Sequence, residues 1–181
     1  IELMKEAGHK VADWIIVMAK GNNQSFYALE DGSQSFYDVE SKKINAIPGQ
    51  SSFIILDHLR TSNTVWKNDE CSLIDIGEGV LNVEFHSKMN TIGGGVLQGI
   101  NKGIDVAEKD FQALVVGNQG ANFSAGANIG MIFMLAVEQE YDELNMAIKY
   151  FQDTMMRMRY SSIPTVAAPH TLTPVSYTHR T

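Results

Sequence analysis

The sequence predicts an α/β fold, and three observations support this prediction. Short apolar runs such as FQALVVGN (111–118) are typical of strands that are buried on both faces of a sheet. Between such runs, apolar residues recur at the three- and four-residue spacing of amphipathic helices. Strands that alternate with helices in this way favour parallel strand pairing.

The first forty residues predict a helix followed by a β-hairpin. Residues 2–20 place apolar side chains at helical spacing, and Gly21 is expected to end that helix. Two copies of QSFY, at 24–27 and 34–37, flank the dipeptide Asp31-Gly32. Aromatic segments on either side of Asp-Gly are typical of two antiparallel strands and their turn.

The middle of the chain is less regular. After the loop IPGQ (47–50), the segment SSFIILDHLR (51–60) fits a short helix or a buried strand, and periodicity leaves both open. Residues 61–71 are polar and aperiodic, so we expect a linker between domains there. SLIDIGEGVLNVEF (72–85) then predicts two short strands around a Gly-Glu-Gly turn.

The remaining segments alternate between helix and strand. A helical pattern over 91–107 precedes the strand at 111–118, and a second helix is expected after Asn128, whose side chain could cap it. The last helix carries apolar side chains at Leu144, Ala147, Ile148, Phe151, Met155 and Met158. Pro164 ends it, and TVAA (165–168) begins another strand.

Composition excludes several classes of protein. The 181 residues suffice for one core, or for one domain and part of another, and the first residue, Ile1, suggests a cut through a longer chain. A net charge of −7 without any basic run argues against binding to nucleic acid or to an anionic membrane. No apolar run is long enough to span a bilayer. The single cysteine, Cys71, fits a reducing compartment, so we expect a cytoplasmic location.

The stretch ANFSAGANIG (121–130) lies between a predicted buried strand and a predicted helix, and it holds no acid, base or metal ligand. The N–H groups at the start of a helix have no partners within the helix, and they favour negative charge in front of them. Small side chains at 124–127 would let a carbonyl oxygen approach this backbone. Alternatively, they only permit close packing of the strand on the helix.

Two segments resemble the crotonase (enoyl-CoA hydratase/isomerase) superfamily. They are NFSAGANIGMI, followed downstream by SSIPTVAAPH, and FHSKMNTIGGGVLQGI, which is similar to the family's first CoA-contact segment. The resemblance implies that the Ala127 N–H is one half of an oxyanion hole for an acyl-CoA thioester. It also implies acyl-CoA contacts by Ser87, Lys88, Met89, Ser124, Ala125, Gly126, Ala127, Asn128 and Ile129, where Asn128 replaces the family's usual Asp. Because homo-oligomers are common in this family, the resemblance also implies, as an expectation, a homo-oligomer through the crotonase domain.

The order of segments along the chain resembles bacterial fusions of 3-hydroxyacyl-CoA dehydrogenase with enoyl-CoA hydratase. This resemblance implies that 1–60 is the end of the dehydrogenase's mainly helical C-terminal region and that 61–71 is a linker. Residues 72–173 would be the N-terminal half of the hydratase domain, a ββα spiral. Residues 174–181 are expected to be a non-native tail, because PVSYTH resembles a reading frame of a transposase adapter.

The parent protein is therefore expected to hydrate enoyl-CoA and to oxidise the 3-hydroxyacyl-CoA product with NAD in fatty-acid β-oxidation. NAD would bind in a domain outside this chain, since IGGGV (92–96) lacks the G-x-G-x-x-G fingerprint. In this family, the second oxyanion donor lies in a glycine run. Two glutamates act as the acid and the base of the hydration reaction. Here no glycine follows Gly130 and no Asp or Glu follows Asp153, so we expect the chain itself to be inactive.

Two other functions stay open: a different crotonase reaction such as enoyl-CoA isomerisation, and a non-catalytic acyl-CoA-binding module. The acidic side chains of Glu138, Glu140, Asp142 and Glu143 are interpreted as a solvated face, and His170 as structural or adjacent to CoA rather than catalytic. No residue spacing suggests a metal site, and none is expected.

Overall fold

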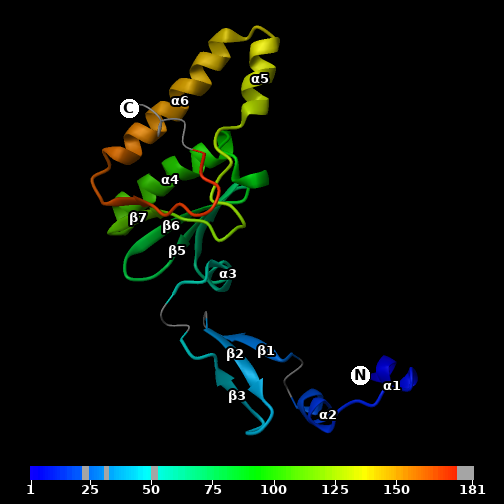
Figure 1. Ribbon diagram of the computed structural model, residues 1–181. Helices are drawn as coiled ribbons and strands as arrows, with labels where there is room; N and C mark the ends of the chain where they lie inside the picture. Colours follow the sequence, from blue (N-terminus) through cyan, green and yellow to red (C-terminus); the bar gives the residue numbers. More distant parts are fainter. Residues whose placement is uncertain (22–24, 31–32, 50–52, 175–181) are drawn as a thin grey trace. The chain divides into compact units, whose positions relative to one another are not determined.

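The computed structural model describes residues 1–21, 25–30, 33–49 and 53–174 (Figure 1). The chain divides into two compact units, Ile1–Ile54 and Ile55–Thr181. This division differs from the expected linker at 61–71, because those residues contribute a strand to the second unit.

The first unit contains two short helices, and the prediction of a single helix over 2–20 is wrong. Helix α1 spans Glu2–Glu6 and α2 spans Asp13–Lys20, which ends at Gly21 as expected. The break follows from Gly8, whose φ of +76° lies in the left-handed region that ends helices. The Gly8-His9 pair therefore marks the end of the first helix, although the apolar spacing continues past it.

The predicted hairpin is confirmed as strands β1 (Tyr27–Glu30) and β2 (Ser33–Asp38), which pair antiparallel. Its expected turn at Asp31-Gly32 lies outside the described residues. A third strand, β3 (Lys43–Ala46), extends the sheet on the other side of β2.

The second unit is built on a five-stranded sheet in the order β4-β5-β6-β7-β8. Its strands are β4 (Thr64–Lys67), β5 (Cys71–Asp75), β6 (Val80–Phe85), β7 (Ala113–Val116) and β8 (Thr165–Ala167). The first three strands pair antiparallel, whereas β6, β7 and β8 pair parallel, as the alternation of strands and helices predicted.

Strand β4 explains why the polar segment 61–71 belongs to the sheet. It is an edge strand in which Trp66 packs against the core while Val65 and Lys67 are exposed. An edge strand needs only one apolar side chain facing inward, and polar residues at an edge protect it from pairing with other chains. The sequence TSNTVWKNDE therefore lacks the apolar run by which the buried strands were recognised.

Helix α4 (Gly94–Asp110) covers one face of the sheet (Figure 1). Val96, Ile100 and Ile104 of this helix pack against the inward side chains of β5, β6 and β7. Helix α6 (Tyr141–Arg159) lies beside α4, and the Asn101 Nδ2 donates to Thr154 Oγ1 between them (2.7 Å). Helix α5 (Ile129–Val137) pairs with α6, and the ambiguous segment 51–60 contains the short helix α3 (Leu56–Leu59).

Among the described residues, no helix combines the length and apolarity that a membrane span requires.

Cys71 is completely buried beneath α4, where Gly99 leaves room for it. A Cβ at Gly99 would lie 2.7 Å from the Cys71 Cβ, closer than side chains pack. Burial, together with the nearby Glu84 and Glu70 carboxylates, raises the pKa of the Cys71 thiol from 9.0 to about 12. The thiol therefore stays protonated in the folded chain well into the alkaline range.

We expect this thiol to make the second unit less stable as the pH rises from about 9 to about 12. The unfolded chain releases the thiol proton near pH 9.0 whereas the folded chain holds it to about 12. The folded state thus binds more protons in this window, and the free energy of unfolding falls by up to about 1.4 kcal/mol per pH unit. Urea unfolding at a series of pH values measures this slope. The Cys71→Ala variant should lack this part of the slope, and equal slopes in both proteins would contradict the expectation.

Candidate functional site

The loop of residues 120–128 follows β7 and is held between two other segments of the second unit. One is the stretch before α4, at 89–92, and the other is the chain after β8, at 170–172. The backbone hydrogen bonds that fix the loop run from Ala125 N to Met89 O (3.1 Å), from Phe123 N to His170 O (3.3 Å) and from Ser124 N to Leu172 O (3.2 Å). Two segments that are distant in the sequence therefore set the position of this loop.

The Ala127 N–H is left without a partner by the way the loop pairs with Ile92. The Ile92 N–H donates to Gly126 O (2.8 Å), and the Asn128 N–H donates to Ile92 O (3.1 Å), which forms an isolated parallel bridge. The N–H of Ala127 takes no part in this bridge, and the described part of the chain offers it no acceptor. Unpaired backbone N–H groups are rare where water is partly excluded, so Ala127 presents an available donor.

Ser124 shows that close packing also explains part of the small-residue stretch. Its side chain is buried, and its Oγ donates to Asn90 O (2.6 Å) and accepts from the Gly126 N–H (3.0 Å). Gly126 has a φ of +87°, a conformation that favours glycine. Ser124 and Gly126 therefore shape the turn, as the close-packing alternative expects, while the approach of a carbonyl oxygen to Ala127 stays a prediction.

A cavity of about 840 Å³ adjoins this donor. It lies among the start of α4, the loop, α5 and α6, and Asn128 at its edge caps α5 by accepting the Met131 N–H (3.3 Å), as predicted. The cavity is lined by Ile92, Gly93, Gly94, Leu97, Ala127, Asn128, Met131, Ile132, Ala147, Ile148, Tyr150, Phe151, Gln152, Met155 and Met156. This lining is mainly apolar, and none of the described residues in it is Asp, Glu, His or Cys.

Of the expected acyl-CoA residues, only Ala127 and Asn128 line the cavity. Ser87, Lys88, Met89, Ser124, Ala125, Gly126 and Ile129 lie outside its lining. The Ser87 Oγ donates to Thr91 O (2.6 Å), while Lys88 and Met89 are exposed on the short 3-10 turn Lys88–Asn90 that precedes α4. Met89, the neighbour of Lys88, is bonded to the loop at Ala125, so Lys88 lies near the loop. Lys88 is not part of the cavity wall.

Asn118, which the sequence analysis did not single out, joins the end of β6 to the loop. Its Oδ1 accepts the Phe85 N–H (2.6 Å), and its Nδ2 donates to Phe123 O (2.8 Å). The residue is only 7% exposed, so this amide satisfies two buried backbone groups. A buried amide directly after a strand is the signal that could have identified it.

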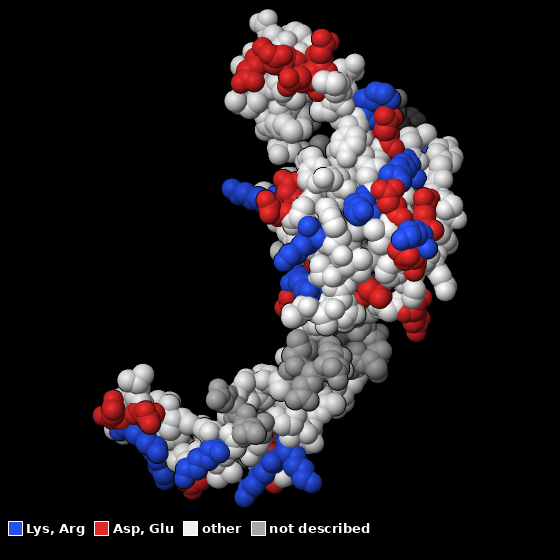
Figure 2. All heavy atoms as spheres, turned by 180° about the vertical axis from the view of Figure 1, so that it is seen from behind, with Lys and Arg blue, Asp and Glu red and all other residues white. Residues whose placement is uncertain are grey.

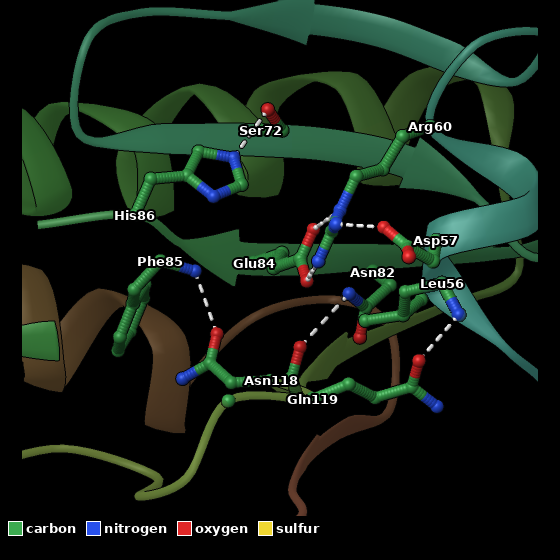
Figure 3. Close-up of polar contacts among 12 residues, drawn as sticks. Leu56, Asp57, Arg60, Ser72, Asn82, Glu84, Phe85, His86, Asn118 and Gln119 are labelled. Carbon is green, nitrogen blue, oxygen red and sulfur yellow. Dashed lines mark hydrogen bonds and ion pairs between the residues drawn. The ribbon is translucent and has the colours of Figure 1, made fainter. Parts of the chain in front are cut away.

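The sheet face opposite α4 carries buried polar side chains (Figure 3). Glu84 is 2% exposed, and its carboxylate accepts from Arg60 Nε (3.0 Å) and Arg60 NH2 (2.7 Å) at the end of α3. Beside it, the His86 ring Nε2 lies 2.7 Å from Ser72 Oγ. The alternation in LNVEF, with Asn82 and Glu84 on one face, was a sequence signal for this polar layer.

The acidic side chains Glu138, Glu140, Asp142 and Glu143 are exposed, and Figure 2 shows acidic groups gathered over the turn between α5 and α6. His170 lies close to the loop, with its Nε2 3.0 Å from Gly120 O. Within the described ranges, no cluster of three His, Cys, Asp or Glu side chains could hold a metal ion.

Comparisons with known proteins relate the chain to fatty acid oxidation enzymes. No protein-family model matches it. A probable 3-hydroxyacyl-CoA dehydrogenase of Bacillus subtilis (strain 168) is 39% identical over 95% of this chain and 22% of that protein. A putative fatty acid oxidation complex trifunctional enzyme of Rickettsia felis is 28% identical over 73% of this chain and 17% of its own length. This chain thus spans about one fifth of the length of these curated relatives.

Solved structures match in fold. An enoyl-CoA hydratase/isomerase from Xanthobacter autotrophicus Py2 has a TM-score of 0.50 and 23% identity, over 57% of this chain and 39% of that chain. An enoyl-CoA hydratase from Shewanella pealeana also has a TM-score of 0.50, at 17% identity, over 56% of this chain and 39% of that chain.

Proposed function

Since the chain has a crotonase-like fold over about half its length, and its homologues are 3-hydroxyacyl-CoA dehydrogenases and trifunctional enzymes of fatty acid oxidation, we propose that its cavity binds the acyl group of an acyl-CoA. In this proposal the Ala127 N–H donates to the thioester oxygen. The apolar side chains of α5 and α6 surround the acyl chain, whose burial provides most of the binding free energy.

The unpartnered Ala127 N–H is the observation that supports this proposal most strongly. A donor that already points away from internal acceptors can bind an incoming carbonyl oxygen without breaking a hydrogen bond. Such preorganised backbone donors stabilise the negative charge that develops on a thioester oxygen during acyl-group chemistry. Lys88, on the exposed turn before α4, would meet a phosphate of the CoA moiety, and Ser87 and Met89 would follow the same path.

We further propose that the parent protein is a bifunctional enoyl-CoA hydratase and 3-hydroxyacyl-CoA dehydrogenase. Residues 72–173 would form the N-terminal half of its hydratase domain, and 1–60 the end of its dehydrogenase region. The match of 95% of this chain to one dehydrogenase of Bacillus subtilis supports a single parent for both units.

NAD belongs, in this proposal, to the dehydrogenase region of the parent. The Gly93–Gly95 run at the start of α4 does not fit a dinucleotide. A Cβ at Gly95 would lie 2.6 Å from Glu70 Oε2, and the Val96 N–H already donates to that carboxylate (3.2 Å). The glycines therefore accommodate an internal side chain, and no step with NAD involves these residues.

The 181-residue chain itself is proposed to bind acyl-CoA without hydrating it. Hydration of an enoyl thioester needs an acid and a base beside the reacting carbons. Among the described residues that line the cavity, none supplies a carboxylate or an imidazole, and Tyr150 is the one titratable side chain. This composition favours the binding-module alternative for the chain as it stands.

Replacing Ala127 by proline tests the proposed donor, because proline has no N–H. In the wild-type chain, we expect 2,4-hexadienoyl-CoA to bind with a shift of its absorption to longer wavelength, since a hydrogen bond polarises the conjugated thioester. Loss of one hydrogen bond of about 0.5–1.5 kcal/mol should raise the Kd roughly two- to tenfold and abolish most of the shift. Titration calorimetry and difference absorption measure the two effects.

The matched control is Ala121→Pro, in the same loop. Ala121 also follows a glycine, and its N–H has no acceptor within the described part of the chain, but it does not line the cavity. Its Kd and spectral shift should equal those of the wild type. If Ala127→Pro at saturating ligand gave the same spectrum as the wild type, the Ala127 N–H would not be the donor to the thioester. Steady hydration of crotonyl-CoA by the wild-type chain would refute the separate proposal that the chain binds acyl-CoA without turnover.

A further inference from the structure

We infer that Glu70, which lies outside the cavity, is a positioning residue for the Ala127 N–H. This inference rests on the function proposed for that donor. Glu70 lies between β4 and β5, next to the start of α4.

The turn that carries Glu70 is fixed to the first turn of α4. The Asn68 Oδ1 accepts the N–H groups of Glu70 (2.9 Å) and Cys71 (2.8 Å), while the Asn68 Nδ2 donates to Gly95 O (2.9 Å). The Glu70 Oε2 in turn accepts the Val96 N–H (3.2 Å). One N–H and one carbonyl of the α4 start are thus held by the same turn.

The glycines of α4 let the Glu70 carboxylate lie directly against the helix backbone. A Cβ at Gly95 would lie 2.6 Å from Glu70 Oε2, and one at Gly93 would lie 3.6 Å from the same atom. A side chain at Gly95 would displace this carboxylate, so the hydrogen bond from the Val96 N–H to Glu70 depends on glycine at that position. The Asn128 Nδ2 lies 3.9 Å from the same Cβ position at Gly93.

The link from α4 to the donor passes through Ile92, the residue before Gly93. Both the N–H and the carbonyl of Ile92 are bonded to the loop, to Gly126 O (2.8 Å) and to the Asn128 N–H (3.1 Å). These two bonds flank Ala127 and determine the direction of its N–H. The path from Glu70 to Ala127 therefore consists of three contacts: carboxylate to helix start, helix start to Ile92, and Ile92 to the loop.

A helix cap without a positioning role would contribute to stability alone. The comparison residue for such a role is Glu108, near the other end of α4, whose exposed Oε1 accepts the Ser162 N–H (2.9 Å). It does not line the cavity. Glu108 is a residue of α4, and its carboxylate accepts an N–H of the segment between α6 and β8, so Glu108→Ala removes a carboxylate acceptor of a backbone N–H without touching the path to Ala127.

The experiment compares Glu70→Ala, Glu70→Gln and Glu108→Ala in the 181-residue chain. In ¹⁵N-resolved spectra without ligand, Glu70→Ala should shift the amide signals of Ile92, Ala127 and Asn128, and Glu108→Ala should leave them in place. Glu70→Gln, which keeps an oxygen for the Val96 N–H, should restore most of the wild-type positions. With 2,4-hexadienoyl-CoA, Glu70→Ala should weaken binding roughly two- to thirtyfold and reduce the spectral shift of the bound ligand.

The outcomes separate this inference from the proposed function. Unchanged amide signals of 92, 127 and 128 in Glu70→Ala overturn the positioning role, whatever the ligand does. An equal disturbance of those signals by Glu108→Ala overturns it as well, because the effect would then follow from general loosening of α4. A wild-type chain that binds no dienoyl-CoA contradicts the proposed function, while the amide signals still decide the role of Glu70.

Discussion

Replacing Arg60 with alanine is expected to lower the free energy of unfolding of the second unit by about 3 kcal/mol. Glu84 is 2% exposed, and both of its carboxylate oxygens accept from the Arg60 guanidinium. Removing one partner of a buried ion pair costs about 3–5 kcal/mol, because the remaining charge is left without compensation. The Arg60 side chain is 41% exposed, so water can reach part of the vacated space, which favours the lower end of this range.

The hydrogen bond to Glu84 also raises the pKa of Arg60, so the guanidinium stays charged throughout the pH range of folding experiments. Urea unfolding followed by the fluorescence of Trp66 measures the loss. A Trp14→Phe background removes the signal of the first unit, because the chain contains two tryptophans.

Two variants make the result specific. Arg159→Ala removes an exposed arginine that stacks over Tyr160, and we expect it to change stability by less than about 1 kcal/mol. Replacing Arg60 and Glu84 together by methionine should recover much of the stability that Arg60→Ala loses, because no buried charge remains. A loss below about 1 kcal/mol for Arg60→Ala would contradict the importance of the pair.

Asn118→Ala is expected to destabilise the second unit by about 2–4 kcal/mol and to weaken acyl-CoA binding. The substitution removes the partners of the Phe85 N–H and of the Phe123 carbonyl, two buried backbone groups. Each unsatisfied buried group costs about 1–3 kcal/mol. The same change releases the loop of 120–128 from the end of β6, so we expect the Ala127 N–H to be held less firmly, although its bonds through Ile92 remain.

The measurements are urea unfolding and titration with 2,4-hexadienoyl-CoA at low temperature, where the variant stays folded. Asn145→Ala is the control, because Asn145 is exposed on α6 and does not line the cavity. It should change stability by no more than about 0.5 kcal/mol and leave the Kd unchanged. If Asn118→Ala were as stable as Asn145→Ala, the amide would not be the link between strand and loop that its hydrogen bonds indicate.

Apolar periodicity predicted most of the second unit. The helices at 94–110 and 141–159 and the strand at 113–116 follow from it, because each buries one apolar face or run against the sheet. The edge strand β4 could not be found in this way, since only Trp66 of its four residues packs against the core. The break between α1 and α2 was concealed for a different reason: Ala7 and Val11 continue the apolar spacing across Gly8.

For the site, the resemblance identified the loop, but the geometry of the donor depends on long-range pairing. Ala127 is free because Ile92, thirty-five residues earlier, bonds to the residues on either side of it. Nothing in the local sequence of either segment specifies this bridge. The hydrogen bond between the Val96 N–H and Glu70 joins residues that are 26 positions apart, and the sequence pattern could not predict it either.

The donor at Ala127 also determines which experiments can detect it. The N–H is part of the main chain, so every residue type except proline would supply it. An alanine scan would leave position 127 untouched, and a search for chemically reactive side chains would pass over ANFSAGANIG altogether. Side-chain replacement in this protein would therefore detect the residues that fix the loop, such as Asn118, Ser124 and Asn90. It would not detect the Ala127 N–H, whose position those residues determine.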